Sequence, residues 1–270
     1  MKRLLPKEKA VISFKRFKIP YRLYGQGANI VCLNGAQQSS AMWLSFIKHF
    51  SAQYQITLFD FPHQGKATLK NPSQPVSLDE QVNILDQVIR KLKIKEPTIC
   101  SASWGGVVAL AFARKYPQDV KRLILASIGL RPNLKMRSAI TNGVNTKNNE
   151  RKKMADVLID SFGKKLPSKV KSQITSQFKT MSEERIKAFS EHGLSVLMKG
   201  SLDKVVELDK IKTPTTILYG KEDMIIDYQD AKQLVDKLPK SKMKTIAGVG
   251  HFLHLEDEKV LKIYESILAN

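Results

Sequence analysis

The stretch Ile99-Cys100-Ser101-Ala102-Ser103-Trp104-Gly105-Gly106 decides how this chain folds. An apolar, strand-like run stands before Ser103, and a helix-like run stands after it. The small residues Ser101 and Gly105, two positions to either side, allow a strand-to-helix turn in which larger side chains would collide. Such a turn lifts the Ser103 hydroxyl clear of the sheet edge, at a helix N-terminus whose dipole favours negative charge. Small-residue turns are common, so the prediction of a nucleophile depends on partner residues elsewhere in the chain.

An acid and a histidine come after Ser103 in the chain. Asp223 stands in the loop after a strand-like run at 215–219, and His251 stands in a glycine-rich loop after another at 243–246. Ligands of open α/β sheets bind at the C-terminal ends of the strands, where these loops would meet. The order Ser, Asp, His is that of the α/β-hydrolase triad. We therefore predict Ser103 as nucleophile, His251 as its base and Asp223 as the acid that orients the base.

Three nearby residues are alternatives to these assignments. His254 could be the base, but it falls within the start of a helix. Asp227 could be the acid, but it stands where the next helix should be capped. Glu222 precedes Asp223 directly and remains a competitor for its place.

Other residues are predicted to complete the site. The oxyanion hole needs two backbone N–H donors, which we assign to Trp104 and to Ala36 in the turn after an early strand. Asn34 stands where many hydrolases carry a histidine and is expected to order this turn or contact substrate. His63, in the loop at 60–65, is the second candidate for substrate contact. Neither cysteines nor histidines have metal-ligand spacing, so we expect no metal and no cofactor.

The remaining sequence alternates between strand-like and helix-like runs, which favours a mostly parallel, doubly wound α/β sheet. The predicted strands are 11–17, 21–24, 30–33, 56–59, 98–100, 122–126, 215–219 and 243–246, the first two antiparallel. Helices are predicted at about 41–50, 78–93 and 104–115; Ser77 and Glu80 form a capping box before the second. We assign 1–128 and 213–270 to an α/β-hydrolase core.

Residues 129–212 interrupt this alternation, because their apolar positions recur only at helical spacing. We predict a helical cap inserted over the active site, where substrate choice would be decided. Some of its methionines are expected to line an acyl tunnel and the others to fill helix interfaces. These methionines are Met136, Met154, Met181 and Met198.

The composition and net charge indicate the domain size, the cellular compartment and the kinds of partner to expect. The 270 residues are 42% hydrophobic, enough for one sizeable domain, and no run is long enough to span a bilayer or serve as a secretory leader. Cys32 and Cys100 fall in predicted buried strands, which suits a reducing cytoplasm. The net charge of +20 fits either an anionic partner or a lysine-rich solvated surface. No nucleic-acid-binding module accompanies it, and the oligomeric state is not indicated.

Four segments resemble the β-hydroxyacyl-ACP acyltransferases of the α/β-hydrolase superfamily. They are Val31-Cys32-Leu33-Asn34-Gly35-Ala36, Thr57-Leu58-Phe59-Asp60-Phe61-Pro62, Ser101-Ala102-Ser103-Trp104-Gly105-Gly106 and Gly250-His251-Phe252-Leu253-His254-Leu255-Glu256. That branch includes the synthase of the hydroxyalkanoyloxy-alkanoate lipid of rhamnolipids and a hydroxyacyl transacylase. The resemblance covers about residues 30–256, is weakest in the cap, and places the family triad at Ser103, Asp223 and His251.

The resemblance implies a β-hydroxyacyl thioester donor on acyl carrier protein (ACP) or coenzyme A, an acyl-Ser103 intermediate and an alcohol or thiol acceptor. Lys66-Ala67 departs from the small residue and serine that hydrolases commonly have there, which leaves chain length and acceptor open. A thioesterase or carboxylesterase, in which water takes the acyl group, is the alternative. A non-catalytic or nucleic-acid-associated scaffold is a third class, disfavoured by the complete set of triad residues.

Overall fold

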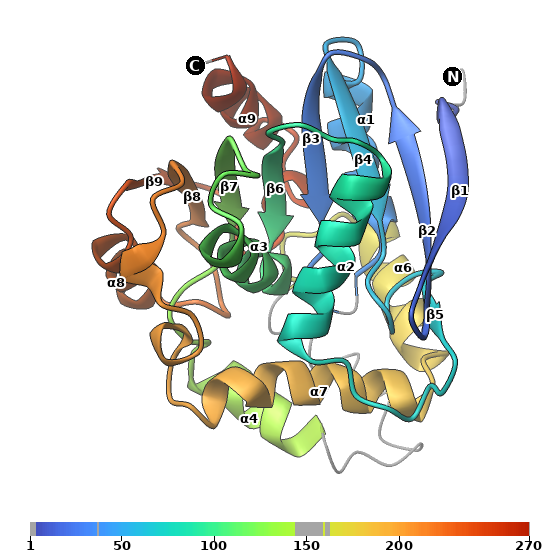
Figure 1. The fold of residues 1–270 in the computed structure, drawn as a ribbon. Helices are drawn as coiled ribbons and strands as arrows, with labels where there is room; N and C mark the ends of the chain where they lie inside the picture. The colour runs from blue at the N-terminus through green and yellow to red at the C-terminus, as the bar shows by residue number, and fades with distance from the viewer. Residues whose placement is uncertain (1–3, 37, 144–158, 160–162, 270) are drawn as a thin grey trace.

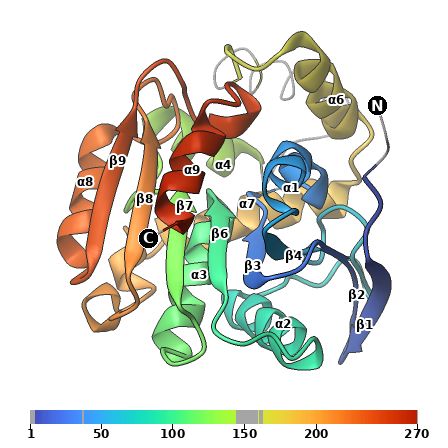
Figure 2. The same cartoon turned by 90° about the horizontal axis from the view of Figure 1, so that it is seen from above.

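The computed structural model describes residues 4–36, 38–143, 159 and 163–269, and its centre is one twisted sheet (Figures 1 and 2). The described strands lie in the order β1-β2-β4-β3-β6-β7-β8-β9, and β5 pairs with β2 outside this path. Their bounds are β1 (Glu8–Phe14), β2 (Phe17–Tyr24), β3 (Ala28–Leu33), β4 (Tyr54–Phe59), β5 (Thr68–Leu69), β6 (Thr98–Ala102), β7 (Arg122–Ala126), β8 (Thr215–Gly220) and β9 (Ser241–Ile246).

The sheet is mostly parallel, as predicted. β1, β2 and β4 pair antiparallel, and every pairing from β4 through β3, β6, β7 and β8 to β9 is parallel. The sequences of the central strands are nearly continuous apolar runs because helices cover both faces of the sheet. All parallel strands therefore end at the same edge, where the loops after β3, β6, β7, β8 and β9 meet.

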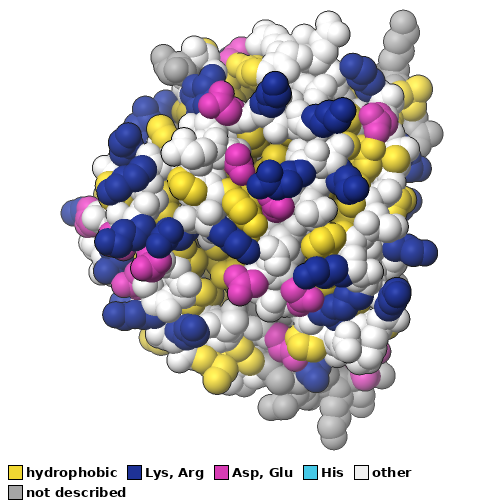
Figure 3. Space-filling view, in the orientation of Figure 1, with side chains coloured by type: hydrophobic (Ala, Val, Ile, Leu, Met, Phe, Trp, Pro, Cys, Tyr) yellow, Lys and Arg dark blue, Asp and Glu magenta, His cyan; other side chains and the backbone are white. Residues whose placement is uncertain are grey.

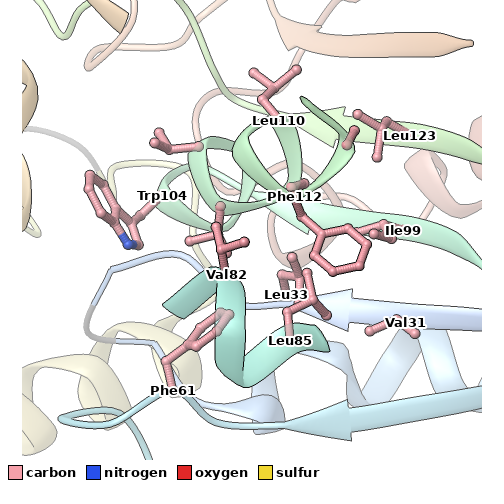
Figure 4. Packing of buried hydrophobic residues seen from close by; sticks show 14 of the residues in the cluster. Val31, Leu33, Phe61, Val82, Leu85, Ile99, Trp104, Leu110, Phe112 and Leu123 are labelled. Atoms are coloured by element: carbon pink, nitrogen blue, oxygen red, sulfur yellow. The ribbon is translucent and has the colours of Figure 1, made fainter. Parts of the chain in front are cut away.

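Helices cover both faces of the sheet. Along β3, Val31 and Leu33 point to the face of the sheet that is covered by α2 (Leu78–Lys91), α3 (Trp104–Lys115) and α8 (Tyr228–Lys237). Ile30 and Cys32 point to the other face and pack against α1 (Leu44–Phe50) and α9 (Val260–Leu268). This alternation results from the two-residue period of a strand. Figure 4 shows Leu33 beside Val82 and Leu85 of α2, with Phe112 of α3 close by.

Two predicted local features are confirmed. The Ser77 hydroxyl accepts from the Glu80 N–H at 3.2 Å, and the Glu80 carboxylate accepts from the Ser77 N–H at 3.1 Å, which is the capping box of α2. Cys32 and Cys100 are buried, free and opposite each other on β3 and β6.

One local prediction was wrong, and one short strand was missed. The predicted strand at 11–17 crosses a hairpin: Phe14 pairs with Phe17, and Lys15 takes a φ of 51° in the turn between them. No glycine or asparagine marks this turn, so the sequence pattern runs on through it. The two-residue strand β5, which pairs with Phe17 and Lys18, was not predicted because it is too short to show a period.

The described residues of 129–212 contain helices and no strand. They are α4 (Leu134–Gly143), α6 (Ser168–Lys179), α7 (Glu183–Leu197) and the 3₁₀ turns η3 (Leu202–Lys204) and η4 (Leu208–Lys210). In Figure 1, α4 and α7 cross below the edge at which the parallel strands end. The boundaries of a separate cap stay a prediction, and Met154 lies outside the described residues. Among the described helices, none combines the length and apolar character needed to cross a membrane.

Candidate active site

Ser103 occupies a strained turn between β6 and α3. Its φ of 46° and ψ of −117° lie outside the regions that residues with a Cβ usually adopt. The turn is held by hydrogen bonds from Ser103 N–H to Ala126 O and from Gly106 N–H to Ser103 O, both 2.8 Å. A Cβ on Gly105 would lie 2.7 Å from Asn34 O and 2.8 Å from Leu33 O. Glycine is therefore required where α3 passes over the end of β3.

Asp223 and His251 form a buried pair beside this turn. The carboxylate comes after β8, the imidazole comes after β9, and Nδ1 of His251 lies 2.9 Å from Asp223 Oδ2 and 3.1 Å from Oδ1. Since an ionised carboxylate only accepts, Nδ1 carries the proton of this bond and Nε2 is the basic nitrogen. Asp223 Oδ1 also accepts from the N–H groups of Ile225 at 2.8 Å and Ile226 at 3.0 Å, which fix the carboxylate.

Ser127 bonds to the backbone of His251, whereas Asp223 bonds to its ring. Its hydroxyl donates to the backbone oxygen of His251 at 2.6 Å, and its own N–H donates to Leu218 O at 2.9 Å. Ser127 was not predicted. Its position directly after β7, at the same edge as Ser103 and Asp223, is the signal that could have identified it.

Ser103 and His251 share the wall of one cavity of about 200 Å³. The sheet edge supplies most of its polar groups, and α4, α6, α7 and Ile159 supply an apolar wall. The apolar residues from these helices are Met136, Ile140, Ile174, Phe178 and Val196. Of the other methionines of this segment, Met181 is buried elsewhere and Met198 is exposed, so only Met136 among the described ones faces this cavity.

The two residues predicted to form the oxyanion hole also line this cavity. Ala36 lies in the turn after β3, and Trp104 is the first residue of α3. The indole N–H of Trp104 donates to Gln81 Oε1 at 2.9 Å, which fixes the ring against α2 (Figure 4). Both residues therefore line the cavity that Ser103 lines, and their role as oxyanion donors stays a prediction.

Of the two roles predicted for Asn34, ordering the turn or contacting substrate, its contacts are those of a residue that orders the turn. Its side chain is buried, donates to Asp60 Oδ1 at 3.0 Å and accepts from the Trp43 indole N–H at 3.0 Å. Asp60 Oδ1 also accepts from Ser40 N–H at 2.6 Å. Asn34 therefore orders the turn from behind and is not among the described residues that line the cavity.

The prediction of His63 as a substrate contact is corrected by the structure. It is buried, takes a φ of 66°, and its Nε2 lies 3.4 Å from Gln74 O. It lines a different depression, between the loop at 72–75 and α7. Burial lowers the pKa of His63 below its usual value, so the ring is neutral at pH 7. The His63 side chain lies in this depression and not among the described residues that line the Ser103 cavity, which sequence position alone does not reveal.

The three alternatives for the triad do not line this cavity in the described structure. His254 points to the opposite face of the sheet, where Nε2 lies 3.1 Å from Met42 O and the ring stacks on Trp43. Asp227 occupies the N-cap position of α8. Glu222 forms an ion pair with Lys165.

Comparison with known proteins agrees with this architecture. The profile of the family described as serine aminopeptidase, S33, matches residues 26–258. The chain is 25% identical to the (R)-3-hydroxydecanoyl-ACP:CoA transacylase of Pseudomonas putida over 88% of this chain and 81% of that protein. It is 27% identical to the monoacylglycerol lipase ABHD6 of Bos taurus over 91% of this chain and 77% of that protein.

Solved structures show the same fold. The α/β hydrolase MGS-M2 from a Medee basin deep-sea metagenome superimposes with a TM-score of 0.83 at 21% identity, covering 97% of this chain and 98% of that one. A putative lipase from Acinetobacter baumannii gives a TM-score of 0.83 at 20% identity, covering 97% and 91%. By its sequence profile and its sheet, this chain belongs to the serine aminopeptidase S33 family of α/β hydrolases.

Proposed function

We propose that this protein is a serine acyltransferase that takes β-hydroxyacyl groups from ACP or coenzyme A thioesters. The observation that carries the proposal is the shared cavity. Ser103, on its strained turn, and His251, oriented by Asp223, face one space with an apolar wall. The sequence similarity to hydroxydecanoyl transacylases supports the acyl class.

In the first half-reaction, Ser103 Oγ attacks the thioester carbonyl carbon while its proton passes to His251 Nε2. The new C–O bond leaves negative charge on the former carbonyl oxygen, which accepts from the N–H groups of Ala36 and Trp104. Asp223 stabilises the imidazolium. The C–S bond then breaks, and His251 gives its proton to the departing thiol sulfur, leaving an acyl-Ser103 ester.

In the second half-reaction, the hydroxyl or thiol of an acceptor gives its proton to His251 and attacks the acyl carbon. The bond to Ser103 Oγ breaks, and the proton returns from His251 to this oxygen. The apolar wall from α4, α6 and α7 fits an alkyl chain.

Ester hydrolysis is the second candidate, because the chain is also similar to monoacylglycerol lipases over 91% of its length. The same residues act in both reactions; in the hydrolase, water replaces the acceptor in the second half-reaction.

Mass spectrometry tests the proposal. We expect an acyl adduct on Ser103 after mixing with a β-hydroxyacyl thioester, and none in Ser103→Ala. A transferred thioester or an ester dimer supports the transferase, whereas free acid alone supports the hydrolase. An active Ser103→Ala variant would overturn both reactions.

A further inference from the structure

Gln38 lies in the turn after β3, and the oxygen of its carboxamide accepts a hydrogen bond within this turn. The N–H of Gly35 donates to Gln38 Oε1 at 2.8 Å, and the backbone N–H of Gln38 donates back to Gly35 O at 3.2 Å. From the opposite side, Gln64 Nε2 donates to the same Gly35 oxygen at 3.0 Å. The turn and the Gln38 side chain therefore brace each other.

This bond uses only the oxygen of the Gln38 carboxamide. Because Oε1 accepts from Gly35, the NH₂ group at the other end of the planar carboxamide is not used by this bond. Gln38 lines the cavity together with Ser103 and His251, and no described residue accepts a hydrogen bond from its Nε2. Two N–H donors are thus available in an apolar-walled space.

The carboxamide lies close to the nucleophile. A Cβ built on Gly35 would lie 2.4 Å from Gln38 Oε1 and 3.4 Å from Ser103 Cβ, so the two side chains flank the same small gap beside the turn. Ala36, whose N–H is assigned to the oxyanion hole, is the next residue of this turn. The Gln38 carboxamide and the Ala36 backbone therefore belong to the same turn, which lies against the Ser103 side chain.

We propose that Gln38 is a further catalytic residue, whose Nε2 donates to the oxygen that becomes negatively charged when Ser103 attacks the acyl carbon. It is a third donor beside the backbone N–H groups of Ala36 and Trp104. The inference rests on the proposed function. A fixed donor in a low-dielectric cavity stabilises developing charge without the reorganisation that water would require. Its effect falls on the transition state more than on the bound thioester.

Two substitutions separate this role from bracing of the turn. Gln38→Glu keeps an acceptor for the Gly35 N–H but replaces the donor group with a carboxylate oxygen. Gln38→Met keeps the length of the side chain and loses both ends. We expect each to lower kcat on the order of a hundredfold, the usual effect of removing one such donor, with KM changed by less than about threefold.

The substrate panel separates oxyanion stabilisation from contact with the substrate hydroxyl, and the pH dependence separates it from bracing of the turn. The loss should be equal for 3-hydroxydecanoyl and decanoyl thioesters, because both form the same oxyanion. The ratio of Gln38→Glu to wild-type kcat should rise as pH falls, since the introduced carboxyl group regains a donor when it is protonated. A loss confined to the hydroxyacyl thioester would overturn the proposal, because Gln38 would then contact the substrate hydroxyl.

Two control variants separate the loss of a hydrogen-bond donor at Gln38 from the loss of support for the turn at Gly35. Gln64→Met removes the opposite brace of Gly35 and should lower kcat less than Gln38→Met. Gln55→Met makes the same change at the far end of β4, where Gln55 donates to Asn29 Oδ1, and should leave kcat unchanged. Thermal melts verify that each variant is folded. Wild-type kcat in Gln38→Glu, together with equal losses in Gln38→Met and Gln64→Met, would leave bracing only and overturn the proposal.

Failure of the proposed function is a separate result. The rate of acyl-Ser103 formation is measured by mass spectrometry in every variant, with Ser103→Ala as reference. If Ser103→Ala turns over as wild type does, the proposed function fails whatever the Gln38 variants show. If Ser103→Ala is inactive and both Gln38 variants acylate at the wild-type rate, only the inference about Gln38 fails.

Discussion

The surroundings of a histidine decide its chemistry, as two residues three positions apart demonstrate. His251 lies against a fixed carboxylate at the rim of the cavity. His254 is 3% exposed, bonds to a backbone oxygen and stacks on Trp43. Burial lowers the pKa of His254 to about 4, so its ring is neutral at pH 7. His251 therefore has the surroundings that its predicted role as a base requires, whereas His254 is a packed side chain.

We expect Asp223→Asn to lower kcat by about 10⁴, because the variant no longer stabilises the His251 tautomer that has its proton on Nδ1. The side-chain oxygen can still accept from Ile225 and Ile226, so the melting temperature should change little. Steady-state rates and thermal melts measure both. Asp227→Asn is the matched control, outside the cavity, and should stay within about twofold of wild type. Equal effects in the two variants would contradict the assignment of Asp223.

His254 should make stability depend on pH. Its pKa is about 4 when folded and about 6.5 when unfolded, so the stability from the neutral ring is complete above pH 6.5. It is lost as pH falls from about 6.5 to about 4, by at most about 3 kcal/mol. Urea unfolding of wild type and His254→Gln should show their free-energy difference shrinking over this range. A difference that is constant with pH would contradict this.

At the level of elements, the contact between α3 and β3 sets the position of the nucleophile. α3 is buried on nearly all sides, and its start passes so close to the end of β3 that Gly105 has no space for a side chain. The strained backbone of Ser103 is maintained because the packing of this helix supplies the energy that the turn costs.

We expect Gly105→Ala to be more harmful than Gly106→Ala. The first Cβ would meet backbone oxygens of Leu33 and Asn34, so α3 must shift, at a cost of about 1–3 kcal/mol. The second would meet Ile128 Cδ1 at 2.7 Å, the far end of a flexible side chain that can rotate away. Chemical denaturation and the rate of Ser103 acylation measure the two effects. Equal losses in both variants would show that the close approach does not control the turn.

At the level of the whole molecule, the dominant electrostatic feature is the net charge of +20. Figure 3 shows Lys and Arg side chains spread over the visible face, with Asp and Glu between them and no single stripe. A field of this kind acts over distance on any anionic partner more than it recognises a particular shape.

We expect the rate with an acidic carrier to depend on salt. Raising the ionic strength from about 0.01 M to about 0.1 M shortens the Debye length from about 30 Å to about 10 Å. For an ACP thioester, kcat/KM should then fall on the order of tenfold. An uncharged N-acetylcysteamine thioester of the same acyl group should change less than about twofold. Equal salt dependence for both would mean that the charge plays no part in carrier binding.

Much of this protein is determined by local sequence. The alternation of strands and helices, the bounds of α3 and β7, the capping box of α2 and the glycine-supported turn at Ser103 depend on interactions between residues close in the chain. The order of Ser103, Asp223 and His251 indicates which strand ends carry the acid and the base, because parallel strands end at one edge.

The directions of side chains in the loops were decided only by tertiary structure. Asn34 turns away from the cavity because Trp43 and Asp60 bond its side chain. Ser127 reaches the backbone of His251 across 124 positions of sequence. His63 belongs to a different depression, and Gln38 lines the cavity while its oxygen accepts from the Gly35 N–H. Local patterns determine where a strand ends, but the direction of a loop side chain depends on partners that only the packed sheet and helices bring within hydrogen-bonding distance.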